Sequence, residues 1–116
     1  FLGKKEYAPY KKLKNAGIDV ALATDYNPGS SNIQSMSFIV SLACIYLKMN
    51  ILDAIKASTY IAAKSLMRNK DIGSIEKGKN ADLIVWNINN VQQIPYTVTN
   101  HPIQYIFKNG ISVFTA

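Results

Sequence analysis

Asp25 is the residue of this 116-residue chain whose surroundings best suit chemistry. It ends a run of small apolar residues and precedes a polar loop that contains Asn27, Gly29 and Ser30. A carboxylate in such a place can ligate a cation or accept a proton. The backbone N–H groups around Gly29, the Asn27 amide and the hydroxyls of Ser30 and Ser31 suit an anionic or amide-rich ligand. The pattern is compatible with a functional loop.

A purely structural role for Asp25 is the competing interpretation. An Asp before an Asn-Pro-Gly sequence often only accepts backbone hydrogen bonds in an Asx turn, or caps a helix. Residue types and spacing leave both interpretations open.

The elements before Asp25 predict how it is positioned. Pro9 can open a short helix that Gly17 ends, and Ile18, Val20 and Leu22 then alternate with smaller residues. This alternation predicts a strand over 18–24 with Asp25 at its C-terminal end. In α/β proteins that edge carries the functional loops.

Helical periodicity dominates the chain after this loop. From a cap at Ser31 or Asn32, apolar residues recur at spacings of three and four as far as Leu47. Asn50 is placed to cap a second helix with Asp53 in its first turn. A third, Ala-rich segment is expected over 60–67.

The pattern changes to short β-like runs from Ile72 onward. A strand is expected over 82–86, and two more flank Asn109-Gly110, a pair typical of a two-residue hairpin because both residues need positive φ. The last third is therefore predicted to be a small β module.

Charge and composition narrow the function classes. The formal charge is +6, and five of the twelve lysines lie in the first fourteen residues, but the chain has only one arginine, Arg68. Nucleic-acid readers usually rely on arginine forks, so we expect a solvated lysine face and no nucleic-acid partner. The longest apolar run is too short for a membrane span, and no signal peptide is evident. The single cysteine, Cys44, is expected to be a buried, inert thiol in a reducing cytosol.

Three other motifs carry little functional weight. The segment 73–79 fits most of a P-loop, but Asn80 replaces the metal-binding hydroxyl and a strand follows where a helix is required. Ser74 and Lys77 match an S-x-x-K pattern without its partner motifs, so a turn explains them better. His101, the only histidine, precedes Pro102 in a polar loop and is expected to be solvated or structural.

A family resemblance is carried by VALATDYNPGSS at 20–31, Met36, SLAC at 41–44 and GSIEKGKNADL at 73–83. Together these blocks resemble the imidazolonepropionase family of the amidohydrolase superfamily, and the likeness extends over residues 7–110. It covers only the C-terminal part of such an enzyme. The family's early His-x-His pair, its later histidine ligand and its acid/base residues have no counterpart in this chain.

The resemblance implies an α/β fold. Residues 1–68 would be the C-terminal portion of a TIM-like (β/α)8 metallo-hydrolase barrel, comprising its last strand and the following helices. Residues 69–116 would be part of a small, composite β-sandwich domain. The enzyme would be cytoplasmic and compatible with a homodimer at full length.

The resemblance also implies roles for individual residues. Asp25 matches the aspartate that binds a single zinc or iron and helps to deprotonate the attacking water. Asn27, Gly29 and Ser30 match positions that hold the substrate or product. The implied reaction is hydrolysis of 4-imidazolone-5-propanoate to N-formimidoyl-L-glutamate in histidine degradation.

Alternatives to this assignment make different demands on the sequence. Another amidohydrolase, a cyclic-amide hydrolase or a deaminase, would keep Asp25 but would not need the residues 27–30. A non-catalytic remnant acting as an interaction module would keep every residue and bind no metal, and a basic nucleic-acid binder would bind with steep salt dependence. Because the histidine ligands are missing, we expect the 116-residue chain alone to be inactive. The strand over 18–24 would also lack sheet neighbours, which exposes unpaired edges and favours aggregation.

Overall fold

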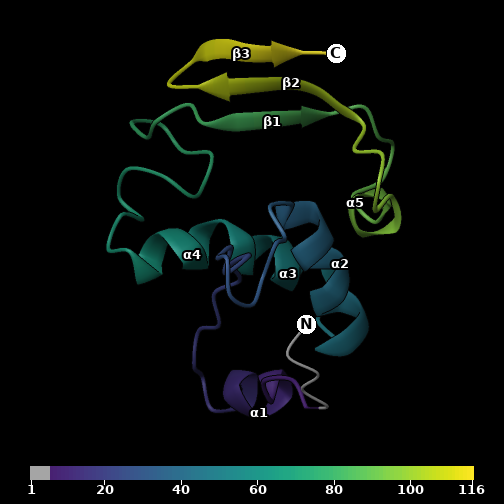
Figure 1. Cartoon of the computed structure of the whole chain (residues 1–116). Coiled ribbons are helices and arrows are strands. Elements are labelled where there is room, and N and C mark those ends of the chain that lie inside the picture. The colour runs from purple at the N-terminus through teal and green to yellow at the C-terminus, as the bar shows by residue number, and fades with distance from the viewer. Residues whose placement is uncertain (1–5) are drawn as a thin grey trace.

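The computed structural model describes residues 6–116, which form a group of helices beneath a small sheet (Figure 1). The elements in chain order are α1 (Tyr10–Asn15), α2 (Met36–Tyr46), α3 (Ile51–Ser58), α4 (Tyr60–Ser65), β1 (Leu83–Trp86), α5 (Gln93–Tyr96), β2 (Ile103–Lys108) and β3 (Ile111–Thr115). The predicted helices and β module are therefore present, in the predicted order. Lys4 and Lys5, two of the clustered lysines, lie outside the described residues.

The main core lies between α1, α2 and α3. Its buried members are Tyr10, Val40, Ala43, Met49, Ala54 and Ala57. Ala54 and Ala57 are completely buried. Their small side chains allow the backbone of α3 to approach its neighbours closely, which places α3 at the centre of the helical part.

Helix α2 starts later than predicted. Ser35 is its N-cap, with Oγ accepting a hydrogen bond from the N–H of Phe38 at 3.2 Å. The predicted cap at Ser31 or Asn32 is wrong because Ser31 belongs to the preceding loop. Its carbonyl accepts from the Asn27 N–H in an isolated bridge, and its hydroxyl donates to the Thr24 carbonyl at 2.9 Å.

Helix α3 is capped as predicted and is also tied to α1. Asn50 Oδ1 accepts from the Asp53 N–H at 2.8 Å. The Asp53 carboxylate accepts from the Tyr10 hydroxyl at 3.0 Å, from Asn50 Nδ2 at 2.8 Å and from the Lys14 ammonium. Hydrogen bonding from Lys14 holds the pKa of Asp53 below its usual range, and Tyr10 and Asn50 act in the same direction. One carboxylate thereby joins two helices.

The strand predicted over 18–24 does not form in the described structure. Val20 and Leu22 do pack against the core while Ala21 and Ala23 are exposed, but Ile18, the first apolar residue of the alternation, is exposed too. A strand also requires a ladder of hydrogen bonds to a neighbour. Here the Leu22 N–H donates to the carbonyl of Ala57 in α3 at 3.0 Å, and no strand lies beside the segment within residues 6–116.

The sheet is an antiparallel meander in the order β1-β2-β3. Leu83 pairs with Phe107 across β1 and β2, and Ile106 pairs with Phe114 across β2 and β3. The predicted hairpin is confirmed, since Asn109 and Gly110 have φ values of 50° and 79°. Both values lie in the left-handed region that a two-residue hairpin of this kind requires.

The P-loop-like segment is a turn, as expected. Lys79 Nζ donates to Ser74 Oγ at 2.5 Å and to Glu76 Oε1 at 3.0 Å, and no helix follows before β1. Gly73, at φ 92°, lies against α4, where an added Cβ would come within 2.6 Å of the Ala63 Cβ. A glycine is therefore needed for the close approach to α4.

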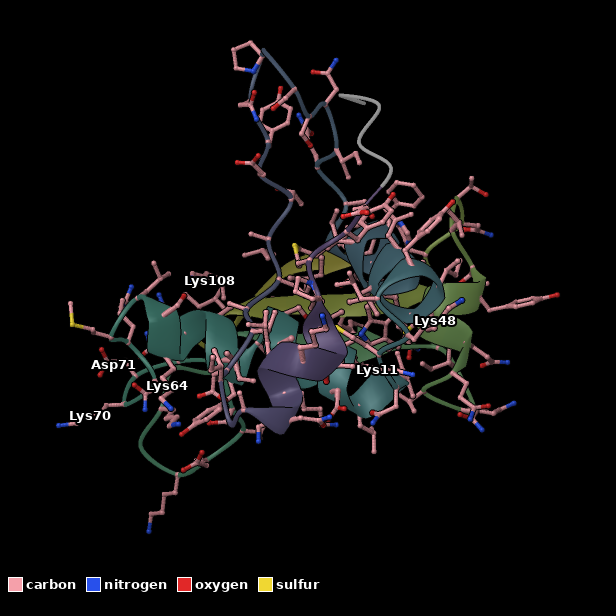
Figure 2. All side chains as sticks on the ribbon, turned by 90° about the horizontal axis from the view of Figure 1, so that it is seen from below. Lys11, Lys48, Lys64, Lys70, Asp71 and Lys108 are labelled. Carbon is pink, nitrogen blue, oxygen red and sulfur yellow. The ribbon has the colours of Figure 1, made fainter. Side chains whose placement is uncertain are left out.

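The surface carries apolar side chains as well as scattered charge. All five residues of β3 are exposed, and Ile111, Val113 and Phe114 among them are large and apolar. In Figure 2, Lys11 and Lys48 lie on one side of the molecule and Lys64 and Lys70 on the other. Among residues 6–116, no helix has the length and apolar character needed to cross a bilayer.

We expect Asp53→Asn to lower the free energy of unfolding by about 1 to 2 kcal/mol at neutral pH, because hydrogen bonds from Tyr10, Lys14 and Asn50 lose a charged acceptor. The folded-state pKa is depressed, so this stabilisation is present above the unfolded value of about 3.9 and is lost as the pH falls through the folded value. Urea unfolding of both proteins at pH 7 and at pH 3 measures it.

Asp19→Asn is the matched control. Asp19 accepts a hydrogen bond from Lys64 at 2.6 Å, and both side chains are about half exposed. Exposed pairs contribute little, so this variant should unfold almost like the parent. Equal losses in the two variants, or an Asp53→Asn difference that persists at pH 3, would contradict the assigned role.

Candidate active-site loop

Asp25 begins a loop that extends away from the body of the molecule between α1 and α2 (Figure 2). Its backbone has φ 50°, a left-handed conformation uncommon for any residue except glycine. The residue is exposed, and among residues 6–116 no hydrogen bond or ion pair involves its carboxylate. Asp25 therefore neither caps a helix nor makes an Asx turn with its side chain.

The Asx turn in this loop is made by Asn27, and not by Asp25 as the structural interpretation of the sequence proposed. Its Oδ1 accepts from the N–H of Gly29 at 2.9 Å and from the N–H of Ser30 at 2.8 Å. Its Nδ2 donates to the Asp25 carbonyl at 2.6 Å. The same amide thus closes the turn and holds the backbone of Asp25 in its left-handed conformation.

Two further contacts close the loop across its base. The N–H of Asn27 donates to the Ser31 carbonyl at 2.9 Å, as an isolated β-bridge. The Ser31 hydroxyl donates to the Thr24 carbonyl at 2.9 Å. The loop is therefore ordered by its own hydrogen bonds rather than by a neighbouring element.

The predicted binding residues lie together in this loop. Ser30 Oγ is within hydrogen-bond distance of both Asn27 Nδ2, at 3.0 Å, and Asn27 Oδ1, at 3.1 Å. A shallow hollow of about 170 Å³ is lined by Pro28, Gly29, Ser30, Ser31 and Asn32. The N–H groups of Gly29 and Ser30 were predicted to bind a ligand. In this structure both donate to Asn27 Oδ1 within the loop. Roles in substrate binding stay predictions.

The chain contributes one carboxylate to any metal centre at this place. Within the part of the chain that the structure describes, no three His, Cys, Asp or Glu side chains are grouped so that they could hold an ion. Cys44 lies in α2 and is partly buried, and burial raises the pKa of its thiol. This agrees with the inert role expected for it.

His101, which was expected to be solvated or structural, makes hydrogen bonds that the sequence did not predict. The ring lies against two adjacent hydroxyls near the start of α2, with Nε2 at 3.2 Å from Ser35 Oγ and Nδ1 at 3.1 Å from Ser37 Oγ. Its role is structural, but its partners precede it by more than sixty residues. No local spacing signals such a contact.

The model of the amidohydrolase family matches residues 2–114. The imidazolonepropionase of Shouchella clausii is 44% identical over 105 residues, which cover 90% of this chain and 24% of that relative. The imidazolonepropionase of Alkaliphilus oremlandii is 40% identical over 109 residues, covering 94% and 26%. The chain spans about a quarter of the length of the curated relatives it matches.

Solved structures have a similar fold. An amidohydrolase from Thermotoga maritima matches with a TM-score of 0.70 and 29% identity, over 91% of this chain and 25% of that one. E. coli guanine deaminase matches with a TM-score of 0.73 over 92% of this chain and 30% of its own. At 20% identity the second likeness concerns the fold alone.

We expect Asn27→Ala to loosen the loop, because the N–H groups of Gly29 and Ser30 lose their acceptor and the Asp25 carbonyl loses its donor. Amide hydrogen exchange at Gly29 and Ser30 should become at least about tenfold faster, as expected for the loss of about 1.4 kcal/mol of local stability. Exchange measured by NMR or by mass spectrometry of short peptides tests this.

Asn32→Ala provides the control for this prediction. Asn32 is exposed and borders the same hollow, but the loop's hydrogen bonds do not involve it. Exchange at Gly29 and Ser30 should be unchanged in this variant. Unchanged exchange in Asn27→Ala as well would show that the amide does not order the loop.

Proposed function

We propose that this chain, which belongs to the amidohydrolase family, is the C-terminal part of an imidazolonepropionase that hydrolyses 4-imidazolone-5-propanoate to N-formimidoyl-L-glutamate in the cytoplasm. The observation that carries the proposal is the exposed Asp25 carboxylate, left without a partner in the described structure by a loop that Asn27 orders from within. Relatives named imidazolonepropionase at 36–44% identity support this member of the family over others.

Asp25 is proposed to be a metal ligand and the proton acceptor of the reaction. Zinc and iron both accept carboxylate oxygen, and an accessible, unpaired carboxylate fits that requirement as one ligand of a larger set. A bound metal lowers the pKa of water, which makes hydroxide accessible at neutral pH. The carboxylate of Asp25 would take a proton from the water whose oxygen bonds to the ring amide carbon. The ring C–N bond would break, and the leaving nitrogen would receive that proton. The remaining ligands must come from residues outside this chain.

The residues after Asp25 are proposed to hold the substrate. Ser30 is half-buried and its hydroxyl can exchange its contact with Asn27 for one with a ligand oxygen. Gly29 allows close approach of backbone to ligand, since it has no side chain at the exposed tip of the loop. Asn27 fixes the relative positions of these groups and offers its amide to the same ligand.

The two parts of the chain are proposed to belong to different domains. Residues 1–68 would complete a (β/α)8 barrel, which supplies the neighbours that the segment 18–24 lacks here. Residues 69–116 would complete a β-sandwich. The exposed apolar side chains of Ile111, Val113 and Phe114 on β3 support this, because a second sheet would cover them.

Asp25→Asn in the full-length protein tests the proposal. The amide keeps the shape of the side chain but removes the charge and the basicity, so we expect kcat to fall by about 10²- to 10⁴-fold and the bound metal to be reduced. Turnover of 4-imidazolone-5-propanoate, followed by its ultraviolet absorbance, and elemental analysis of the purified protein provide the measurements.

Asp19→Asn again serves as a control, since Asp19 is exposed and pairs only with Lys64 among its described neighbours. It should retain activity and metal. Full activity of Asp25→Asn would refute the catalytic role. Metal binding that depends on Asp25, without turnover of this substrate by the parent protein, would indicate an amidohydrolase with another cyclic amide or amine as substrate. No metal and no turnover would favour a non-catalytic remnant.

The 116-residue chain on its own should be inactive, because Asp25 is the only metal ligand that we assign to it. We expect no turnover above buffer when the purified chain is supplied with zinc or iron, under conditions in which the full-length protein is active. Mass-verified protein from a host that lacks the enzyme excludes contamination. Measurable turnover by such a sample would contradict the ligand assignment.

A further inference from the structure

His101 joins the loop before β2 to the first turn of α2. Its Nε2 is 3.2 Å from Ser35 Oγ, and Ser37 Oγ lies 3.1 Å from Nδ1 and 3.2 Å from Nε2. The two hydroxyls are also 2.9 Å from each other. The ring and the two serines therefore form one polar cluster between segments of the chain more than sixty residues apart.

The cluster lies at the residue that connects α2 to the Asp25 loop. Ser35 is the N-cap of α2, and its hydroxyl accepts from the N–H of Phe38. An N-cap residue has non-helical backbone angles, so the direction of the chain changes at this residue. A ring bonded to the cap hydroxyl thus restrains the direction of the loop that ends there.

A second contact holds His101 and its neighbours against α2. Ser41, a buried residue one turn further along α2, donates to the Pro95 carbonyl at 2.8 Å. Pro95 lies in α5, which is beside α2 in Figure 1, and its neighbour Ile94 is buried. The segment 93–102 therefore contacts α2 at two points along the helix, through His101 in the first turn and through Pro95 at Ser41. These two contacts define the position of His101.

The loop itself has few other attachments. On its N-terminal side, the N–H of Leu22 donates to the Ala57 carbonyl of α3. Between Leu22 and Ser35, the hydrogen bonds of the described structure join residues of the loop to one another. The loop is thus internally ordered, and its placement depends on one anchor at each end.

We propose that His101 is a positioning residue: by holding Ser35 and Ser37, it fixes the C-terminal anchor of the loop that carries Asp25. The consequence for catalysis rests on the proposed function, because Asp25 must meet metal ligands supplied by other parts of the protein. A displacement of about 1 Å at a reacting group can cost about 10²-fold in rate. His101 acts through Ser35 and Ser37, without touching the substrate.

Variants of His101 in the full-length protein provide the test. We expect His101→Ala to lower kcat about tenfold or more with a smaller change in KM, and His101→Gln, which retains a donor and an acceptor at similar reach, to recover most of the loss. Asn100→Ala is the control, because Asn100 is an exposed neighbour in the same loop. A general loss of folded protein would not be rescued selectively by Gln.

A double-mutant cycle with Ser37 tests the contact itself. If His101 acts through the serines, Ser37→Ala should cause little further loss in a His101→Ala background, so that the two effects are not additive. Losses that multiply, or His101→Ala with the kcat of the parent protein, would overturn the proposal.

Hydrogen exchange separates this inference from the proposed function. His101→Ala should accelerate exchange at the amides of Ser37 and Phe38 and in the segment 32–35, whether or not the protein hydrolyses 4-imidazolone-5-propanoate. If exchange there matches the parent protein, the positioning role fails even where the enzyme is active. If exchange rises but the parent shows no turnover, the anchor is real and the assigned reaction is wrong.

Discussion

The close packing of α3 is the constraint on which the helical part depends. Ala54 and Ala57 are fully buried, so α3 can lie close enough to contact α2 on one side while Asp53 at its first turn holds α1 on another. The carbonyl of Ala57 also receives the N–H of Leu22. A larger side chain at either alanine would separate α3 from its neighbours, with an overpacking cost of about 1 to 3 kcal/mol, and would displace the anchor of the loop as well.

One set of contacts orders the loop that carries Asp25, and a different set fixes where the loop lies relative to the rest of the chain. Asn27 and Ser31 order it from within, through contacts with Asp25, Thr24, Gly29 and Ser30. Its orientation relative to the rest of the chain comes from Leu22 at one end and Ser35 at the other. An arrangement of this kind keeps the geometry around Asp25 constant even where the surrounding domain is incomplete. It also lets two remote residues, Ala57 and His101, control where that geometry lies.

Local signals in the sequence predicted local structure well. Asn50 caps α3 and Asn109-Gly110 forms the hairpin, because each depends on residues within a few positions. The alternation over 18–24 placed Val20 and Leu22 against the core correctly but not Ile18, which is exposed, and a strand also needs a partner. Ser31 was assigned to a helix cap because the pattern does not reveal its backbone pairing with Asn27, which keeps it in the loop.

Contacts between residues far apart in the sequence could not be predicted from local patterns. The contact of His101 with Ser35 and Ser37 requires the whole fold, and nothing near His101 in sequence indicates it. The candidate site shows the same division. The position of Asp25 after an apolar run was enough to predict it as a site residue. That its carboxylate has no hydrogen-bond partner among the described residues follows only from the structure, in which Asn27 makes the turn. The sandwich domain and the substrate roles of Asn27, Gly29 and Ser30 stay predictions.

The conformation of Asp25 connects the loop's order to the proposed chemistry. A non-glycine residue at φ 50° costs free energy, although Asp tolerates this region better than most residues. The bond from Asn27 Nδ2 to the Asp25 carbonyl offsets part of that cost. Because the side chain of Asp25 takes no part in the turn, its carboxylate does not have to break an internal hydrogen bond before it can bind a cation. Because Asn27 already fixes the backbone of Asp25, less backbone freedom would be lost when the proposed metal binds, which favours the role proposed for this single residue on a protruding loop.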